Sequence, residues 1–146
     1  SDPDVSVNYT DENTTKIVID DFEKIEKVRN VAPGLPMPEY IPDDYNFDTL
    51  IVDIAFDGSY SAIYKFGNKD GSEFSLTIQH DSEVDYSSIV VDYVTETVDI
   101  DDRTICLWEN PIEDSYGVTV IGHDYVATII GGIDSEEMEI LATKLN

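Results

Sequence analysis

Apolar and polar residues alternate along most of the chain from residue 47 to residue 131. The alternation is clearest at Phe74, Leu76 and Ile78, which are separated by single polar residues. A period of two is typical of β-strands that bury one face. Segments rich in Asp, Asn and Gly separate the alternating runs, at residues 57–58, 67–71, 101–102 and 122–124. The pattern therefore predicts a series of adjacent strands joined by tight turns.

The two faces of these strands both carry apolar residues. One parity forms the predicted core face: Leu50, Val52, Ile54, Phe56, Tyr60, Tyr64, Phe66, Phe74, Leu76 and Ile78. A solvated sheet would be polar on its other face. Here that second face still carries Ile51, Ile63, Val91, Tyr93, Trp108 and Ile130. The second face is either covered by N-terminal elements or free to contact a ligand or partner, and we favour coverage.

A short helix and a proline-rich segment are the elements expected to provide this cover. Phe22, Ile25 and Val28 are three residues apart, as on one face of a short helix. Four prolines within residues 33–42 exclude a helix there, because proline lacks a backbone N–H and fixes φ. We expect an extended connector in this segment. The polar residues up to about Thr15 should form a loose, acidic arm.

The C-terminal residues have helical spacing. Asp134 stands three residues before Glu137, as in a capping box, and Met138, Leu141 and Leu145 lie on one apolar stripe. The strands precede this helix and do not alternate with helices as in parallel sheets. We predict an α+β fold, a curved antiparallel meander sheet of about six to eight strands with the C-terminal helix packed on one face.

The length of 146 residues, with 41% hydrophobic residues, suits one folded unit with a single core. Within it we expect two parts. Residues 1–36 form an acidic N-terminal arm with a short strand, a short helix and the start of the proline linker. Residues 37–146 form the antiparallel sheet domain with its C-terminal helix.

Charge narrows the range of partners. The chain has 8 Lys and Arg against 32 Asp and Glu, a formal net charge of −24. Such a protein repels phosphate, which argues against binding to nucleic acids and to anionic lipids. Mimicry of a nucleic acid is a minor alternative. No apolar run reaches the ~20 residues that span a bilayer, so we expect no direct membrane insertion of this segment.

Catalysis is not expected, and we predict that the protein is not an enzyme. Cys106, the single cysteine, lies between Ile105 and Leu107, a setting that suits a buried, inert thiol rather than a nucleophile. His80 and His123 belong to separate strand ends, and nothing in the sequence brings either of them to Cys106. A small hydrolase, the less favoured alternative, would need a cleft that joins a histidine to a nucleophile.

Calcium is the metal that the acidic residues favour, and no other cofactor is expected. Asp99, Asp101 and Asp102 could supply hard oxygen ligands around one turn. The sequence has no D-x-D-x-D-G loop, however, and aspartate is common in turns because its side chain bonds nearby backbone groups. We therefore expect at most weak Ca²⁺ binding.

Aromatic residues mark the best candidates for a contact surface. If the second face binds something, Tyr93 and Trp108 should dominate the contact, because aromatic side chains contribute most to contact energy. Ile51 and Ile63 would extend the same surface. The corresponding function is a small-ligand or lipid-binding module that uses this apolar face as a concave pocket.

A resemblance to a known family adds a functional expectation. Residues 37–45, MPEYIPDDY, resemble a recurrent opening, P-x-Y-I-P-x-G-Y, with Asp44 in place of the glycine. The end of the chain is also similar, with a glycine turn and an aromatic at Gly122 and Tyr125, a strand ending in glycine, and an acidic-capped helix. These features resemble a domain of unknown function in Gram-positive bacteria. In that family the domain is the extracytoplasmic C-terminal part of membrane-anchored regulators resembling anti-sigma factors, and of some sporulation lipoproteins.

The resemblance covers residues 37–146 and implies no catalytic residues. It implies a non-catalytic sensing or binding domain outside the cytoplasm, at the cell surface, with a protein or a small ligand as its partner. The sequence starts at Ser1 without a signal-peptide pattern. We therefore expect a membrane or lipid anchor upstream of Ser1.

Overall fold

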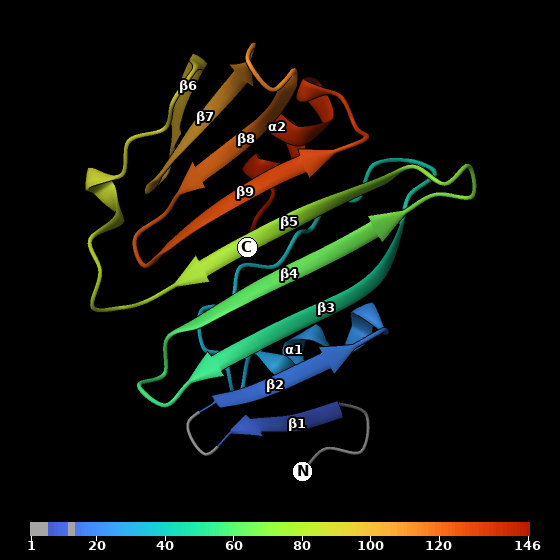
Figure 1. Cartoon of the computed structure of the whole chain (residues 1–146), viewed down its shortest axis with the longest axis vertical. Helices are drawn as coiled ribbons and strands as arrows, with labels where there is room; N and C mark the ends of the chain where they lie inside the picture. The colour runs from blue at the N-terminus through green and yellow to red at the C-terminus, as the bar shows by residue number, and fades with distance from the viewer. Residues whose placement is uncertain (1–5, 12–13) are drawn as a thin grey trace.

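The computed structural model describes residues 6–11 and 14–146, which form one nine-stranded antiparallel sheet with both α-helices on one side (Figure 1). In chain order the strands are β1 (Ser6–Asp11), β2 (Thr14–Ile19), β3 (Asn46–Ala55), β4 (Tyr60–Gly67), β5 (Glu73–His80), β6 (Val94–Ile100), β7 (Arg103–Asn110), β8 (Ser115–Ile121) and β9 (Tyr125–Gly131). The helical elements are η1 (Phe22–Lys24), α1 (Ile25–Val28), η2 (Tyr86–Ser88) and α2 (Ser135–Thr143). The predicted α+β class, antiparallel sheet and C-terminal helix are confirmed.

Two meanders meet in the middle of the sheet. The strand order is β1-β2-β3-β4-β5-β9-β8-β7-β6, so β5 pairs with β9 rather than with β6. The connection from β5 to β6, residues 81–93, must therefore reach the far edge of the sheet (Figure 1). On the way, its residues from Asp85 onward lie against side chains of β7, β8 and β9. The alternation pattern predicts strands and their faces, but it does not contain this reversal of order.

The expected loose arm contributes an edge strand instead. β1 pairs with β2, and β2 pairs with β3 from Thr14–Ala55 to Ile19–Leu50. Backbone N–H and C=O groups make these pairs, so a polar segment forms a strand without an alternating apolar pattern. Residues 1–5 and 12–13, the rest of the expected arm, lie outside the described residues.

One face of the sheet, here called the core face, carries the buried side chains that the alternation predicts. Its fully buried strand residues include Leu50, Val52, Tyr64, Leu76, Ile105, Val118, Val120 and Ile129. Phe56 contradicts the prediction, because its side chain is 83% exposed. β3 ends at Ala55, so Phe56 belongs to the following turn, where a period of two no longer sets the side-chain direction.

Both α-helices cover this core face. Helix α2 packs against β7, β8 and β9 and buries Met138, Leu141 and Ala142. Helix α1 buries Ile25 and Val28 in the same hydrophobic core. Figure 1 shows α1 and α2 behind the sheet, on the same side of it.

The proline connector, residues 33–42, is fastened to the core face by tyrosine hydroxyls. The Tyr60 hydroxyl donates to the Pro33 carbonyl at 3.1 Å, and the Tyr64 hydroxyl donates to the Pro36 carbonyl at 2.8 Å. The expectation that α1 and the connector cover the second face is therefore wrong. Both lie with α2 on the core face (Figure 1). The second face, here called the open face, has no α-helix over it among the residues described, and the β5–β6 connection with η2 lies against its β7–β9 part.

The residues that carry the family resemblance hold the connector in place. The Tyr40 hydroxyl donates to Glu137 Oε2 of α2 at 2.6 Å, and this hydrogen bond raises the pKa of Tyr40 to about 12. The Tyr45 hydroxyl donates to Ser72 Oγ at 2.8 Å. Asp44 has φ 71°, a left-handed conformation that glycine adopts at little cost, which accounts for the glycine of the resembled pattern. This motif is therefore structural.

Candidate functional site

The four residues predicted to form a contact surface lie on the open face in two separate groups. Ile51 and Ile63 are directly opposite each other on β3 and β4. Trp108 lies on β7, and Tyr93 immediately precedes β6 and shares a pocket with Trp108. Strands β5, β9 and β8 separate the two groups, so they do not form one contact site.

Trp108 lines a pocket of about 400 Å³ between the open face and the β5–β6 connection. This Trp108 pocket is also lined by Ile89, Val90, Val91, Asp92, Tyr93, Asn110, Thr119, Val126 and Thr128. The indole N–H donates to Thr119 Oγ1 at 3.1 Å, so the polar atom of the ring is already satisfied within the protein. What remains for a ligand is an apolar aromatic surface, with one carboxylate and no basic side chain around it.

Gly117 on β8 lets the Trp108 ring lie against the sheet. A Cβ atom at this position would be 2.5 Å from Trp108 Cζ2 and 2.7 Å from the Ile129 carbonyl oxygen, closer than real Cβ contacts. Glycine in a strand often marks such a close approach. The fold therefore fixes the orientation of the indole before any ligand arrives.

Tyr93 holds a strained backbone conformation at the rim of the Trp108 pocket. Its φ is 61°, in the left-handed region that an aromatic residue rarely adopts, and its side chain is 44% exposed. The Glu109 N–H donates to the Tyr93 carbonyl at 3.1 Å, which ties this residue to β7. Such a conformation costs about 1–3 kcal/mol and is concentrated at functional sites in proteins.

The second group borders a different hollow of the open face. Ile63 lines a pocket of about 350 Å³ with Ile130 and Gly131 of β9, and with the charged residues Lys65 and Glu73. Its lining also includes Phe66 and Phe74, together with a third charged residue, Asp48. The Trp108 pocket has one charged side chain, Asp92, and is therefore the more suitable of the two for apolar contact.

The predicted calcium ligands do not converge. Asp101 and Asp102 form the exposed turn between β6 and β7, and the Asp99 carboxylate accepts a hydrogen bond from the Thr104 hydroxyl at 2.8 Å. Throughout residues 14–146, no group of three or more His, Cys, Asp or Glu side chains is arranged to hold a metal ion. The hydrogen bond with Thr104 gives Asp99 a local contact across the turn, and weak Ca²⁺ binding by these aspartates stays a prediction.

Cys106 is buried on the open face, and this burial raises the pKa of its thiol. A nucleophilic cysteine needs the opposite shift. The structure does bring Cys106 and His123 to one pocket of about 420 Å³, with Asp85 and Asp102, a proximity that the sequence does not indicate. Burial outweighs the opposing effect of Thr97 on the pKa of the thiol.

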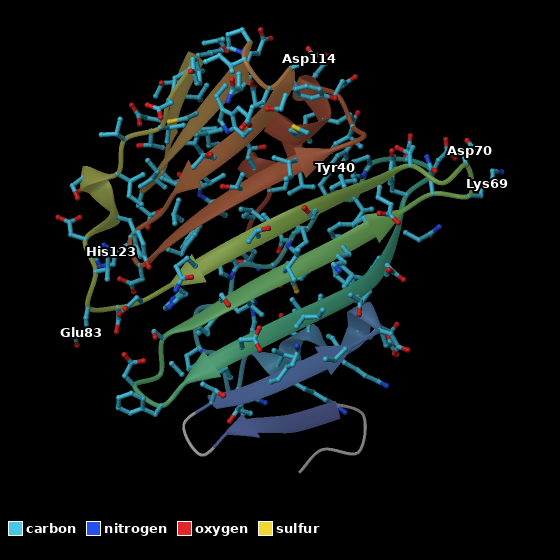
Figure 2. All side chains as sticks on the ribbon, viewed as in Figure 1. Tyr40, Lys69, Asp70, Glu83, Asp114 and His123 are labelled. Atoms are coloured by element: carbon cyan, nitrogen blue, oxygen red, sulfur yellow. The ribbon has the colours of Figure 1, made fainter. Side chains whose placement is uncertain are left out.

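The two histidines also line a common pocket, of about 210 Å³. His80 stacks on Tyr60, with ring centroids 4.6 Å apart, and burial lowers the pKa of its imidazole. His123 projects from the turn between β8 and β9, close to the connection that carries Glu83 (Figure 2). Sequence reasoning missed this pocket because it joins strand ends that become neighbours only when β9 pairs with β5.

Arg103, the cation of this histidine pocket, is engaged by the protein itself. Its Nη1 donates to the Leu145 carbonyl at 2.7 Å and to the Ala142 carbonyl at 3.3 Å. A cation at the C-terminal end of a helix stabilises the helix by pairing with its free carbonyl groups. We therefore assign Arg103 to the support of α2.

Comparison with known families places the chain in one of them. A family model described as "Domain of unknown function (DUF4367)" matches residues 35–145. The chain belongs to the DUF4367 family. The match runs from the proline connector through β3 to the residues after α2, so β1, β2 and α1 extend the sheet and its cover beyond the matched part of the DUF4367 domain. No curated protein and no solved structure matches the chain.

The family match confirms the predicted resemblance at the level of a domain of unknown function. Among the helices of the described residues, none is long and apolar enough to cross a bilayer.

Proposed function

We propose that this DUF4367 domain is a non-catalytic binding domain that contacts its partner through the open face. The placement of the covering elements carries the proposal. Helices α1 and α2 and the proline connector all lie on the core face, so the β5–β6 connection is the cover that the described residues give to the open face around Trp108 and Tyr93. An apolar surface that the protein covers only in part is typical of a binding site. The raised thiol pKa of Cys106 supports a non-catalytic role.

The location is the second part of the proposal. The domain acts outside the cytoplasm, at the cell surface, as part of a membrane- or lipid-anchored protein that resembles anti-sigma factors. Support for this part comes from the resemblance of residues 37–45 to the opening of such domains. A sensing domain of this kind needs no cofactor.

A small-ligand or lipid-binding module is the second candidate. The Trp108 pocket favours it, because a volume of about 400 Å³ lies within the range of small-molecule sites. Its rim also carries exposed apolar side chains, Val90 at 83% and Tyr93 at 44%. The two candidates use the same face and differ in the size of the molecule that occupies it.

Site-specific photo-crosslinking in the native cells tests both parts. A photoreactive amino acid replaces Val90 at the pocket rim, and a matched control replaces Phe56, which is equally exposed but lies in the β3–β4 turn. We expect a discrete protein adduct from position 90 that is absent from position 56. A small-molecule adduct at position 90 would favour the second candidate, and equal adducts at both positions would contradict the open-face site.

Protease added to intact cells tests the location. We expect the domain to be digested while a cytoplasmic marker protein survives. Survival of the domain, together with its recovery in the soluble cytoplasmic fraction, would contradict the extracytoplasmic part of the proposal.

A further inference from the structure

β6 is an edge strand whose outer side carries unpaired backbone groups. It is the last strand in the sheet order, and its described neighbour is β7 alone (Figure 1). Ile100 and Arg103 flank the two-residue turn at 101–102 and form a hydrogen-bonded pair, as does Val98 with Ile105. Hydrogen-bonded and non-hydrogen-bonded pairs alternate in an antiparallel ladder. Thr97 and Asp99 therefore direct their N–H and C=O groups away from β7. Such an edge is a template for another strand.

The chain that leads into β6 exposes apolar side chains beside this edge. Val90 is 83% exposed, Tyr93 44% and Val94 39%. The left-handed backbone of Tyr93, with φ 61°, lies at the point where the connection turns into β6. Strain and exposed apolar surface thus coincide at the beginning of the edge strand.

The charge around β6 is almost entirely negative. Residues 92–114 contain one base, Arg103, and eight acids: Asp92, Glu96, Asp99, Asp101, Asp102, Glu109, Glu113 and Asp114. No salt bridge within residues 14–146 involves any of these acids. Asp114 lies in the turn between β7 and β8, at the end of the sheet where β6 begins (Figure 2).

The negative charge around β6 determines which kind of segment can pair with its outer side. A second copy of the chain, with its own net charge of −24, would bring a second set of acids against the first, and an acidic segment would be repelled in the same way. A cationic segment is attracted, and its backbone finds the free N–H and C=O groups of Thr97 and Asp99. The register irregularity between Val94 and Glu96, together with the acids, is a typical protection against self-pairing.

We propose that β6 receives an extended, lysine- or arginine-rich segment of a partner protein, which adds to the sheet as a further antiparallel or parallel strand. Main-chain hydrogen bonds supply the affinity and the surrounding carboxylates supply the selectivity, as in other cases of strand addition. This inference rests on the proposed function, because it names the partner class and the binding mode of the same binding domain.

Hydrogen exchange measured by NMR with defined peptides tests the proposal. The probes are the blocked peptide KVKVTVKV, its acidic counterpart EVEVTVEV, and a basic peptide with two central prolines, which cannot add as a strand. We expect the basic peptide to slow amide exchange of Thr97 and Asp99 at least tenfold, because these two N–H groups gain acceptors. The acidic and proline peptides should leave both exchange rates unchanged. Equal protection by the acidic peptide, or no protection by the basic one, overturns the proposal.

Variants of the edge provide the matched control. Thr97→Pro removes an outward N–H, and we expect it to weaken binding of the basic peptide at least tenfold, whereas Thr97→Val keeps the N–H and should stay within about twofold. If Thr97→Pro does not fold, Glu96→Lys serves instead and should weaken binding of the basic peptide while improving that of the acidic one. Wild-type affinity in the folded edge variant contradicts strand addition.

The failure of this inference is distinguishable from failure of the proposed function. If the basic peptide shifts the emission of Trp108, the single tryptophan, while Thr97 and Asp99 exchange freely, strand addition at β6 is wrong and open-face binding stands. The crosslinking contrast between positions 90 and 56 tests open-face binding without reference to any peptide.

Discussion

On β4, the two faces of the sheet can be compared between adjacent residues. Tyr64 points to the core face, is fully buried and donates a hydrogen bond to the Pro36 carbonyl. Its neighbour Ile63 points to the open face, stays partly exposed and borders a pocket. Both side chains are large and largely apolar, so hydrophobicity does not decide which face is closed. The covering elements decide it. Tyrosine hydroxyls on the core face donate hydrogen bonds to carbonyl groups of the proline connector, which an isoleucine side chain cannot do.

The same contrast recurs at the other end of the sheet. Val118 and Val120 of β8 lie under α2 on the core face, whereas Thr119 between them turns to the open face and accepts the hydrogen bond of Trp108. The core face is thus used for stability, and the open face keeps an oriented aromatic ring with no helix over it. A surface of this kind is available for binding.

Cavity formation should separate the two faces most strongly. Leu76 is fully buried on the core face, and the adjacent Thr77 is exposed on the open face. We expect Leu76→Ala to lower the free energy of unfolding by about 2–5 kcal/mol, and Thr77→Ala to change it by less than about 0.5 kcal/mol. Urea denaturation of the two variants measures both. Similar losses at the two positions would show that the open face is also packed.

Gly117→Ala sharpens the comparison within the open face. The new methyl group would collide with Trp108 and with the Ile129 carbonyl, so we expect a loss of about 1–3 kcal/mol and a shifted tryptophan emission. Gly67→Ala is the matched control, because its Cβ would be 3.7 Å from the nearest atom, the Ser72 carbonyl oxygen. Unchanged stability and emission in Gly117→Ala would mean that the indole does not lie against β8.

A smaller effect is expected where the connector turns toward the core face. Asp44 holds a positive φ, so Asp44→Gly should raise the free energy of unfolding by about 0.5–1 kcal/mol. The neighbour Asp43 has no positive φ, and Asp43→Gly should lower stability by about 0.4–1 kcal/mol through the entropy of the unfolded chain. Denaturation curves recorded side by side test the opposite signs. The same sign for both variants would be inconsistent with the conformation of the connector.

The smallest effect concerns the pH dependence of the free energy of unfolding that His80 causes. His80 stacks on Tyr60, and burial lowers the pKa of its imidazole, although Asp124 and Asp81 act in the opposite direction. As the pH falls, His80 is therefore protonated more readily in the unfolded chain than in the folded protein. This difference lowers the free energy of unfolding as the pH falls below about 6.5. We expect His80→Asn to lose less stability than the wild type between pH 7.5 and pH 5.5. A loss of stability in His80→Asn equal to that of the wild type over this pH range would contradict the role given to the buried imidazole.

The sequence predicts the strands, their turns and the residues of the core face well, because alternation reports directly which side chains are buried. It fails at Phe56, where the strand has already ended, and at β1, which pairs through its backbone. The sequence also predicts the N-terminal cap of α2, because the Asp134 carboxylate accepts a hydrogen bond from the Glu137 N–H at 2.8 Å.

The sequence predicts the residues of the candidate site, but not how they are grouped in space. Tyr93 and Trp108 are readable as exposed-parity aromatics, but their separation from Ile51 and Ile63 depends on the pairing of β5 with β9, a long-range contact without a local signal. The covering elements were assigned to the wrong face for a similar reason. An amphipathic pattern indicates that a segment packs on a sheet, but not on which face. The hydroxyls of Tyr60 and Tyr64 hold the connector on the core face, and they lie about thirty residues away in the chain.

Hydroxyl-radical footprinting read by mass spectrometry tests the central claim most directly, because it reports the solvent exposure of side chains on both faces in one experiment. The account predicts that Tyr93, Trp108 and Ile130 on the open face are oxidised readily in the native protein, while Tyr64 and Phe66 on the core face react only after unfolding. Protection of Tyr93 and Trp108 to the same degree as Tyr64 would contradict the account, because it would mean that the chain covers both faces of its sheet.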